Sequence, residues 1–228
     1  MITLHHCIDA RSFRPLWTLE ELGLPYRLQM LAFPPRVLHK AYRDLNPLGT
    51  VPLLVDGATR MTESAAICHY LAARHSPGNL NVEADEPDFG SYLNDLHFGE
   101  ATLTFPQTLV LRYGAFEAPE RRQPQVVSDY TQWFLARLRH LEVRLDRQDY
   151  LDAGRFTVAD VSVGYALLLA SHLGLQASFT PAVARYWERL QLRPAYLRAA
   201  QAQLVAAREQ GIVLTPAPLT GPPIKPAS

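Results

Sequence analysis

The stretch Cys7–Arg27, CIDARSFRPLWTLEELGLPYR, decides how the first part of the chain is interpreted. Residues 2–7, which lead into it, alternate loosely between apolar and polar types and predict a strand. Leucines then recur at helical spacing until Gly23, a residue type that often ends a helix in a left-handed conformation. Residues 26–31 alternate again. We therefore expect a second strand, parallel to the first, because a helix connects the two.

The chain up to His75 continues this pattern of strands and helices. A helical stripe from Leu38 to Leu45 is ended by Asn46-Pro47, and VPLLVDG followed by TRM predicts a hairpin that turns at Asp56-Gly57. A third helix is expected over Glu63–His75. The order strand, helix, strand, helix, strand, strand, helix is typical of a small α/β sandwich.

The rest of the chain shows helical spacing only. Turn-forming residues and the acidic run VEADEP predict a linker over 79–86, between a first domain at 1–78 and an all-α domain at 87–210. Residues 211–228 are proline-rich, and we expect them to form a mobile tail rather than a lid. The expected helices are Asp88–Arg112, with a kink or break at Pro106, and Pro124–Leu145, Thr157–His172, Thr180–Leu192 and Arg193–Glu209.

Thr157 marks the clearest helix start in the sequence. A threonine at the N-cap with an acid, Asp160, three residues later is a close relative of the capping box, and Thr180-Pro181 predicts a second capped start. The apolar run Val161–Leu175 is shorter than the roughly 20 residues that a membrane span needs. A helix buried on all sides explains this run better.

Composition excludes several classes of function. Lys and Arg total 22, as do Asp and Glu, so the chain offers no net charge to attract nucleic acid or an anionic membrane. Hydrophobic residues make up 48% and charged residues 19%, the balance of a globular protein. Cys7 and Cys68 are the only cysteines and lack metal-ligand spacing, so we expect no metal and a reducing compartment. Because no leader pattern opens the chain, we expect a cytoplasmic protein.

Four segments in the right order give the chain a resemblance to a known family. They are TLEELGLPYR, NPLGTVPLLVDG, TESAAICHYLA and FTVADVSVGYAL, and in these the chain resembles the cytosolic glutathione S-transferases over almost its whole length. The resemblance implies a thioredoxin-like N-terminal domain followed by an all-α C-terminal helical domain. It also implies a homodimer that uses glutathione as co-substrate and promotes attack of its thiolate on a small hydrophobic electrophile, a transferase activity associated with detoxification.

The resemblance also implies which residues bind glutathione. A cis peptide before Pro52 would turn the backbone of Val51 toward the peptide ligand, as an added strand pairs with a sheet edge. Glu63 would pair with the ammonium of the γ-glutamyl group, and Ser64 would receive its carboxylate at a helix start. Where the family often has a basic residue before the Val-Pro pair, this chain has Thr50. The missing cation is then to be sought at His39 or Lys40.

The loop before the first helix departs from the family pattern. Glutathione reacts as a thiolate, and lowering a thiol pKa by two units takes about 2.7 kcal/mol of preferential stabilisation of the anion. Ala10 stands where the theta-like classes carry a serine, and Arg11 stands where the cysteine-type bacterial classes carry a thiol. Ser12 is the nearest hydroxyl and is also a natural N-cap. Catalysis would therefore rest on Ser12 or on the charge of Arg11.

Two other functions remain open at this point. The absence of the usual hydroxyl at Ala10 and of a cation at Thr50 favours a glutathione-binding or scaffold protein without turnover. A glutathione-dependent isomerase, dehalogenase or peroxidase would use the same fold with different chemistry. The sequence does not identify the electrophile.

Overall fold

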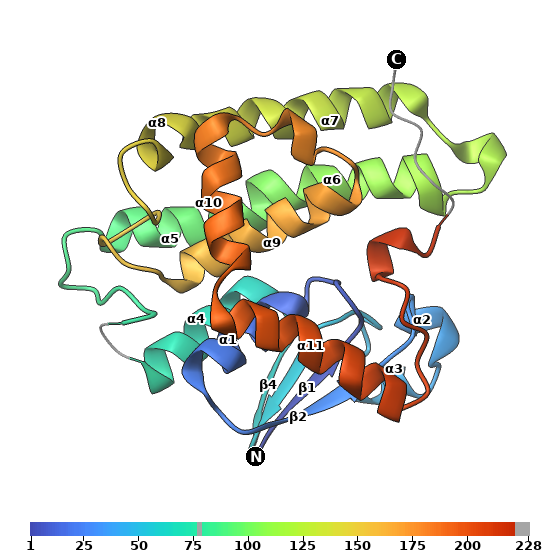
Figure 1. The fold of residues 1–228 in the computed structure, drawn as a ribbon. Coiled ribbons are helices and arrows are strands. Elements are labelled where there is room, and N and C mark those ends of the chain that lie inside the picture. Colours follow the sequence, from blue (N-terminus) through green and yellow to red (C-terminus); the bar gives the residue numbers. More distant parts are fainter. Residues whose placement is uncertain (77–78, 222–228) are drawn as a thin grey trace. The chain divides into compact units, whose positions relative to one another are not determined.

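The computed structural model describes residues 1–76 and 79–221, which divide into two compact units (Figure 1). The first unit contains residues 1–76 and 191–217, and the second contains residues 79–190 and 218–221. Residues 77–78, at the end of the expected first domain, and residues 222–228 of the expected tail lie outside the described residues.

A four-stranded mixed sheet forms the centre of the first unit. Its strands are β1 Ile2–His6, β2 Tyr26–Met30, β3 Leu53–Asp56 and β4 Thr59–Met61, in the order β2-β1-β3-β4. The parallel pairing of β1 with β2 confirms the predicted crossover, and β3 pairs antiparallel with both β1 and β4. The hairpin turns at Gly57, whose φ of 59° is the left-handed conformation that glycine adopts without steric cost. This is the sheet of a thioredoxin-like domain.

The helices of the first unit are α1 Phe13–Leu22, α2 Pro35–Leu38, α3 Tyr42–Leu45, α4 Ser64–His75 and α11 Pro194–Glu209. The single helix expected over Leu38–Leu45 is wrong, because α2 and α3 are separate four-residue helices. His39 breaks the path between them. Its backbone leaves the helical region, and its ring Nε2 accepts a hydrogen bond from the Ala32 N–H at 2.8 Å.

Helix α11 belongs by packing to the first unit, although its place in the chain predicted that it would belong to the all-α domain at 87–210. Trp17 of α1, which is fully buried, packs edge-on against Tyr196 of α11 with ring centroids 5.0 Å apart. Arg193, just before α11, forms an ion pair with Glu21 at 2.6 Å. Domains that are predicted from sequence alone are continuous along the chain, whereas packing brings together apolar helix faces that lie far apart in the chain. The last long helix therefore lies beside the first.

Helices make up the second unit, apart from turns and one isolated bridge between Asp152 and Arg155. Its helices are α5 Phe89–His97, α6 Phe105–Leu111, α7 Pro124–Leu138, α8 Glu142–Leu145, α9 Val158–His172 and α10 Pro181–Gln191, with π-helical stretches at Phe98–Thr104 and Arg112–Phe116 and 3-10 turns at Pro119–Arg121, Arg139–Leu141 and Gln176–Ser178. The helical path does not end at Pro106. Instead, its hydrogen-bond pattern changes from π to α one residue before that proline.

Helix α9 is the core of the second unit, as its apolar composition predicts. Every residue of α9 from Val158 to Ala170 is buried. Gly99 allows close approach, because a Cβ atom there would lie 2.5 Å from the Ser162 hydroxyl oxygen. Along residues 1–76 and 79–221, no helix is both long enough and apolar enough to cross a bilayer.

The predicted capping box at the start of α9 is confirmed. The Thr157 side chain accepts a hydrogen bond from the Ala159 N–H at 3.3 Å, and Asp160 accepts the Thr157 N–H at 2.8 Å. Burial raises the pKa of Asp160 to about 6, although the hydrogen bonds that it accepts act in the opposite direction. Helix α10 begins at Pro181, as predicted, but the Thr180 hydroxyl donates to Glu142, whose carboxylate accepts the Ala182 N–H in place of the predicted hydroxyl cap.

Candidate glutathione site

The site loop, defined as Cys7–Ser12, connects β1 to α1. Ala10 is buried, and the Phe13 N–H donates to its carbonyl at 2.8 Å. Ser12 is fully buried, and its hydroxyl oxygen accepts the Cys7 N–H at 3.3 Å, so the side chain turns back toward β1. The expectation that Ser12 caps α1 is wrong, because its side chain makes no capping hydrogen bond to that helix. Arg11, by contrast, is only half-buried.

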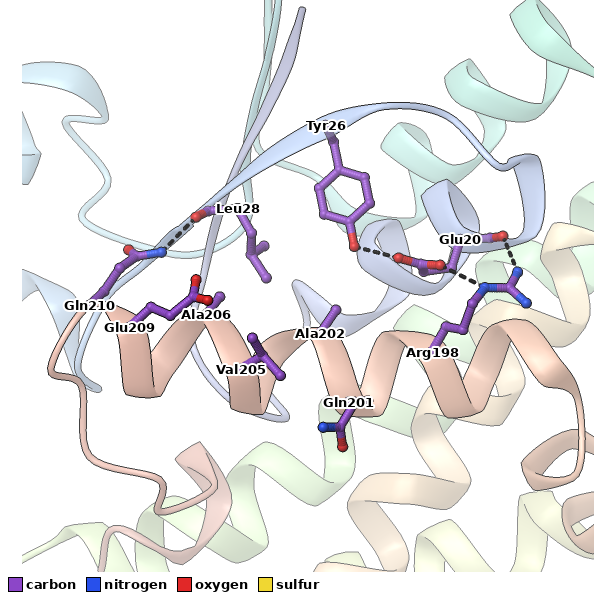
Figure 2. A pocket seen from close by; sticks show the side chains of 10 residues that line it. All are labelled: Glu20, Tyr26, Leu28, Arg198, Gln201, Ala202, Val205, Ala206, Glu209 and Gln210. Atoms are coloured by element: carbon purple, nitrogen blue, oxygen red, sulfur yellow. Dashed lines mark hydrogen bonds and ion pairs between the residues drawn. The ribbon is translucent and has the colours of Figure 1, made fainter.

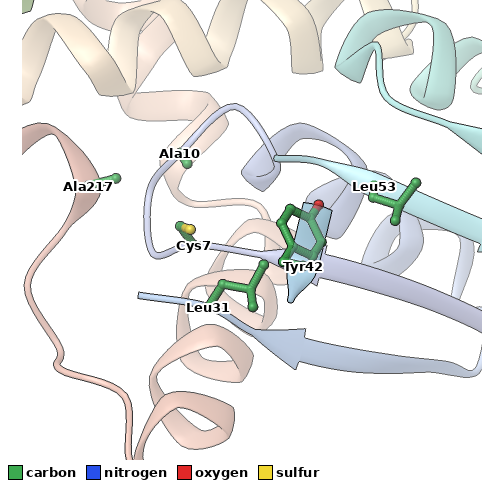
Figure 3. Packing of buried hydrophobic residues seen from close by; sticks show 6 residues of the cluster. All are labelled: Cys7, Ala10, Leu31, Tyr42, Leu53 and Ala217. Carbon is green, nitrogen blue, oxygen red and sulfur yellow. The ribbon is translucent and has the colours of Figure 1, made fainter. Parts of the chain in front are cut away.

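Cys7 is unsuited to thiol chemistry in this arrangement. Its side chain is 1% exposed and lies in an apolar cluster with Ala10, Tyr42, Leu53 and Ala217, shown in Figure 3. Burial raises the pKa of the Cys7 thiol to about 12, so the thiolate is strongly disfavoured. Cys7 is buried as expected, but the strand that it was expected to end stops one residue earlier, at His6.

The segment around Val51 has the backbone geometry that the resemblance implied. The Val51–Pro52 peptide is cis, and Val51 is half-buried beside the buried Pro52. Thr50 is exposed, and its carbonyl accepts hydrogen bonds from the Tyr42 hydroxyl and from the Asn46 side-chain amide, each at 2.8 Å. The expected helix stop at Asn46 therefore also positions the Thr50 carbonyl.

The start of α4 brings together three polar side chains. Glu63, exposed and extended, immediately precedes Ser64, the first residue of the helix. Ser64 is 3% exposed, and its hydroxyl oxygen accepts a hydrogen bond from Arg14 Nη1 of α1 at 3.1 Å. Because a hydroxyl has a single proton, Ser64 keeps that proton to donate to another acceptor. The buried Arg14 cation and the helix start both favour an anion at this position.

Arg14 was not among the site residues predicted from the sequence. It lies among apolar residues in FRPLW and is fully buried, whereas arginine is usually exposed. Its position three residues after Arg11 gives no sequence signal for a contact with Ser64, which lies 50 residues away. Only the packing of α1 against α4 brings the two side chains together.

His39 and Lys40 are the residues that were expected to supply the missing cation near Thr50. His39 Nε2 accepts the Ala32 backbone N–H at 2.8 Å, so this ring nitrogen is engaged by the backbone and is not free to contact a ligand carboxylate. Lys40 is exposed and remains a candidate. Arg43 adds a second one, because its Nε atom lies 3.7 Å from the position that a Cβ atom on Gly49 would occupy.

A separate groove of about 540 Å³ lies in the first unit between β2 and α11 (Figure 2). At one end Glu20 accepts hydrogen bonds from Tyr26 at 2.5 Å and from Arg198 at 2.9 Å. At the other end Gln210 Nε2 donates to the Leu28 carbonyl at 2.9 Å. These polar groups form hydrogen bonds to one another within the unit. We therefore interpret the groove as a gap between packed elements and not as a ligand site.

Comparison with known proteins identifies the family. A family model for the glutathione S-transferase N-terminal domain matches residues 10–74. Glutathione S-transferase hmp2 of Hypomyces subiculosus is 30% identical over 201 residues, which cover 82% of this chain and 92% of that protein. Glutathione S-transferase 3 of Schizosaccharomyces pombe is 38% identical over 103 residues, but the match spans only 45% of this chain and 43% of that relative.

A solved structure agrees with this result. The glutathione transferase from Methylococcus capsulatus is 25% identical, with a TM-score of 0.79, and the match covers 90% of this chain and all of that one. The chain therefore belongs to the glutathione S-transferase family, with a thioredoxin-like N-terminal domain and a largely helical C-terminal part.

Proposed function

We infer that this protein is a glutathione transferase that promotes attack of the glutathione thiolate on a small hydrophobic electrophile. Membership of the family supports this, and the start of α4 is the observation that carries it. There an exposed carboxylate, Glu63, adjoins a hydroxyl, Ser64, that the buried cation Arg14 holds in place. An ammonium and a carboxylate on one carbon, as in the γ-glutamyl group, need this combination of an anion beside donors.

The rest of glutathione is held by the segment before β3. The main chain of Val51 pairs with the cysteinyl residue of the ligand, and Pro52 fixes the path of the segment. Thr50, whose carbonyl is already held by Tyr42, borders the position of the glycyl carboxylate. Arg43 or Lys40 supplies the positive charge that this carboxylate requires.

The sulfur is stabilised as a thiolate by Arg11 in preference to Ser12. The Ser12 hydroxyl is fully buried and accepts the Cys7 N–H, whereas Arg11 is half-buried on the same loop. A guanidinium remains protonated at all relevant pH values and favours a neighbouring anion. In the reaction the thiolate forms a carbon–sulfur bond and the leaving group departs from the same carbon with the bonding electron pair.

The peptide-binding assignment is tested by calorimetry with glutathione. Glu63→Gln removes a charge-assisted contact, which is worth about 1.5–3 kcal/mol, so the Kd should rise about tenfold or more. Glu209→Gln, at an exposed glutamate of the same unit, is the matched control and should leave the Kd unchanged. Equal affinity for the Glu63→Gln variant and the wild type would overturn the role of Glu63.

The sulfur assignment is tested by turnover. With 1-chloro-2,4-dinitrobenzene as electrophile, the thiolate displaces chloride, and the conjugate is followed by its absorbance. Arg11→Ala should lower kcat/KM and raise the pKa of the bound thiol, and Ser12→Ala should change that pKa less. The reverse order would assign sulfur stabilisation to Ser12.

The same assays separate the alternative functions. Tight glutathione binding without turnover of any electrophile would indicate a binding or scaffold protein. Release of oxidised glutathione would indicate a peroxidase, and recovery of free glutathione after turnover would indicate an isomerase. We also propose that the protein is a cytoplasmic homodimer that acts in detoxification. Light scattering of the purified chain and fractionation of the source cells test the first two of these statements.

A further inference from the structure

The site loop contains one residue in an unfavourable backbone conformation. Asp9 has a φ of 51°, in the left-handed region, which residues other than glycine seldom adopt and which aspartate and asparagine tolerate best. Such a residue persists only where the surrounding structure holds it in place. The side chains that hold Asp9 therefore determine the path of the loop on which Ala10, Arg11 and Ser12 lie.

Gln203 of α11 holds Asp9 through both ends of its amide group. Gln203 Nε2 donates to Asp9 Oδ1 at 2.7 Å, and Gln203 Oε1 accepts the Asp9 N–H at 3.1 Å. The same Oε1 atom accepts a third hydrogen bond from His6 Nε2 at 2.9 Å. Gln203 is only 4% exposed, and its bond to His6 is buried, whereas its two bonds to Asp9 are partly buried. A polar side chain 194 residues away thus fixes the conformation of Asp9.

The segment after α11 holds the neighbouring residue. The Ala217 N–H donates to the Ile8 carbonyl at 2.7 Å. Ala217 is 3% exposed and packs in the cluster that contains Cys7 and Ala10 (Figure 3). The expectation that residues 211–228 form a mobile tail is therefore wrong at Ala217, where the backbone is hydrogen-bonded to the site loop.

We propose that Gln203 is the positioning residue of the sulfur site and that the Ala217 N–H is its second attachment. Through Asp9 and Ile8 these two groups fix the loop path and thereby the distance from the Arg11 guanidinium to the glutathione sulfur. This proposal rests on the proposed function. Neither group touches the ligand. Both act through the backbone, because a rotation at Asp9 displaces every atom of Arg11 two residues later.

Substitutions at Gln203 separate positioning from charge. Gln203→Leu removes the three hydrogen bonds without adding a charge. Gln203→Glu keeps the side-chain shape but replaces the donor by an anion that faces Asp9. The double substitution Asp9→Asn with Gln203→Glu exchanges amide and carboxylate. It restores the donor–acceptor pair and the original net charge, and asparagine tolerates the left-handed conformation.

The readout is the ultraviolet absorbance of the bound glutathione thiolate as a function of pH, together with the glutathione Kd. Gln203→Leu and Gln203→Glu should each raise the pKa of the bound thiol by about one unit. At a pH below the bound-thiol pKa of both the wild type and the variant, kcat should then fall about tenfold, while the glutathione Kd changes less than threefold. The double variant should return to within twofold of the wild-type kcat. A purely structural role would lower the unfolding temperature and leave the thiol pKa unchanged.

The Ala217 attachment supplies an independent pair of variants for the case in which the Gln203 variants do not fold. Ala217 begins a 3-10 turn, Ala217–Leu219, and Ala217→Pro replaces the N–H donor by a ring methylene that faces the Ile8 carbonyl, so the attachment is lost. Ala217→Gly keeps the donor. Ala217→Pro should raise the pKa of the bound thiol, and Ala217→Gly should not.

The possible outcomes distinguish a failure of the proposed function from a failure of the positioning role. A wild-type chain that binds no glutathione overturns the proposed function and the positioning role with it. A wild type with a lowered thiol pKa that neither Gln203→Leu nor Ala217→Pro changes overturns the positioning role alone. An increase seen only with Gln203→Glu also overturns it, because the effect would then come from the added charge.

Discussion

Acidification should destabilise the first unit through His6, a fully buried histidine whose ring bonds to Gln203. Burial lowers the pKa of His6 from 6.5 to about 4, against the opposing effects of Gln203 and Asp9. The unfolded chain therefore takes up a proton at a higher pH than the folded chain does. The resulting stability is fully present above pH 6.5 and is lost as the pH falls toward 4. The loss is about 2 kcal/mol at pH 5 and about 3 kcal/mol below both pKa values.

Two carboxyl groups of the second unit act in the opposite direction. Burial raises the pKa of Asp160 to about 6 and that of Asp152 to about 7. In the folded protein these carboxyl groups keep protons that they release in the unfolded chain at a pKa of about 3.8. The folded protein therefore loses stability as the pH rises from about 4 to 7. The pH profile of the wild type thus mixes opposing effects of similar size. The contribution of His6 is isolated only by comparison with a variant.

His6→Gln provides that comparison, because its side-chain amide offers an N–H to Gln203 and does not titrate. The free energy of unfolding in urea is measured for the wild type and the variant at pH 7 and pH 5. The difference between the two proteins should change by about 2 kcal/mol in favour of the variant at the lower pH. His75→Gln, at an exposed histidine of the same unit, controls for the loss of an imidazole. A difference that is the same at both pH values would refute the reasoning.

Three further substitutions test particular contacts. Gly49→Ala should lower the free energy of unfolding by about 1–3 kcal/mol in urea titrations, because Gly49 has a φ of 63° and a Cβ there would lie 2.8 Å from Arg36 Cβ. Arg14→Leu should raise the glutathione Kd about tenfold by calorimetry, since it removes the cation that orients Ser64. Asp160→Asn should lower the free energy of unfolding by about 2 kcal/mol in thermal denaturation, because the capping box at the start of α9 loses its carboxylate. Unchanged values would contradict the importance of each contact.

The elements that the sequence predicts well are those specified by neighbouring residues. The capping box depends on Thr157 and Asp160, which are three residues apart, and the hairpin depends on Asp56-Gly57. Local spacing was misleading at Leu38–Leu45, where a continuous apolar stripe concealed the break at His39. That break involves a hydrogen bond from Ala32, a residue outside the stripe.

Much of the candidate site depends on contacts between residues far apart in the chain. Glu63 and Ser64 were predicted from a short motif, and they stand at the expected helix start. The side chains that support the site, Arg14 and Gln203, act over 50 and 194 residues. Neither belongs to a motif, because a buried arginine or glutamine is favourable only when its partner lies in the right place. Sequence spacing does not encode that condition.

The replacement of the family hydroxyl by Ala10 need not abolish activation of the sulfur. Lowering the thiol pKa by two units takes about 2.7 kcal/mol, and a cation 4–6 Å away supplies about 3–4 kcal/mol at an effective dielectric constant of about 20. Arg11 is half-buried, so this attraction is partly screened by solvent and falls with added salt. A hydrogen bond from a buried hydroxyl such as Ser12 would respond little to salt. If Arg11 activates the sulfur, the pKa of the bound thiol should rise between low and high ionic strength, and Arg11→Ala should remove this dependence. A pKa that stays constant across ionic strength would instead assign the activation to a hydrogen bond.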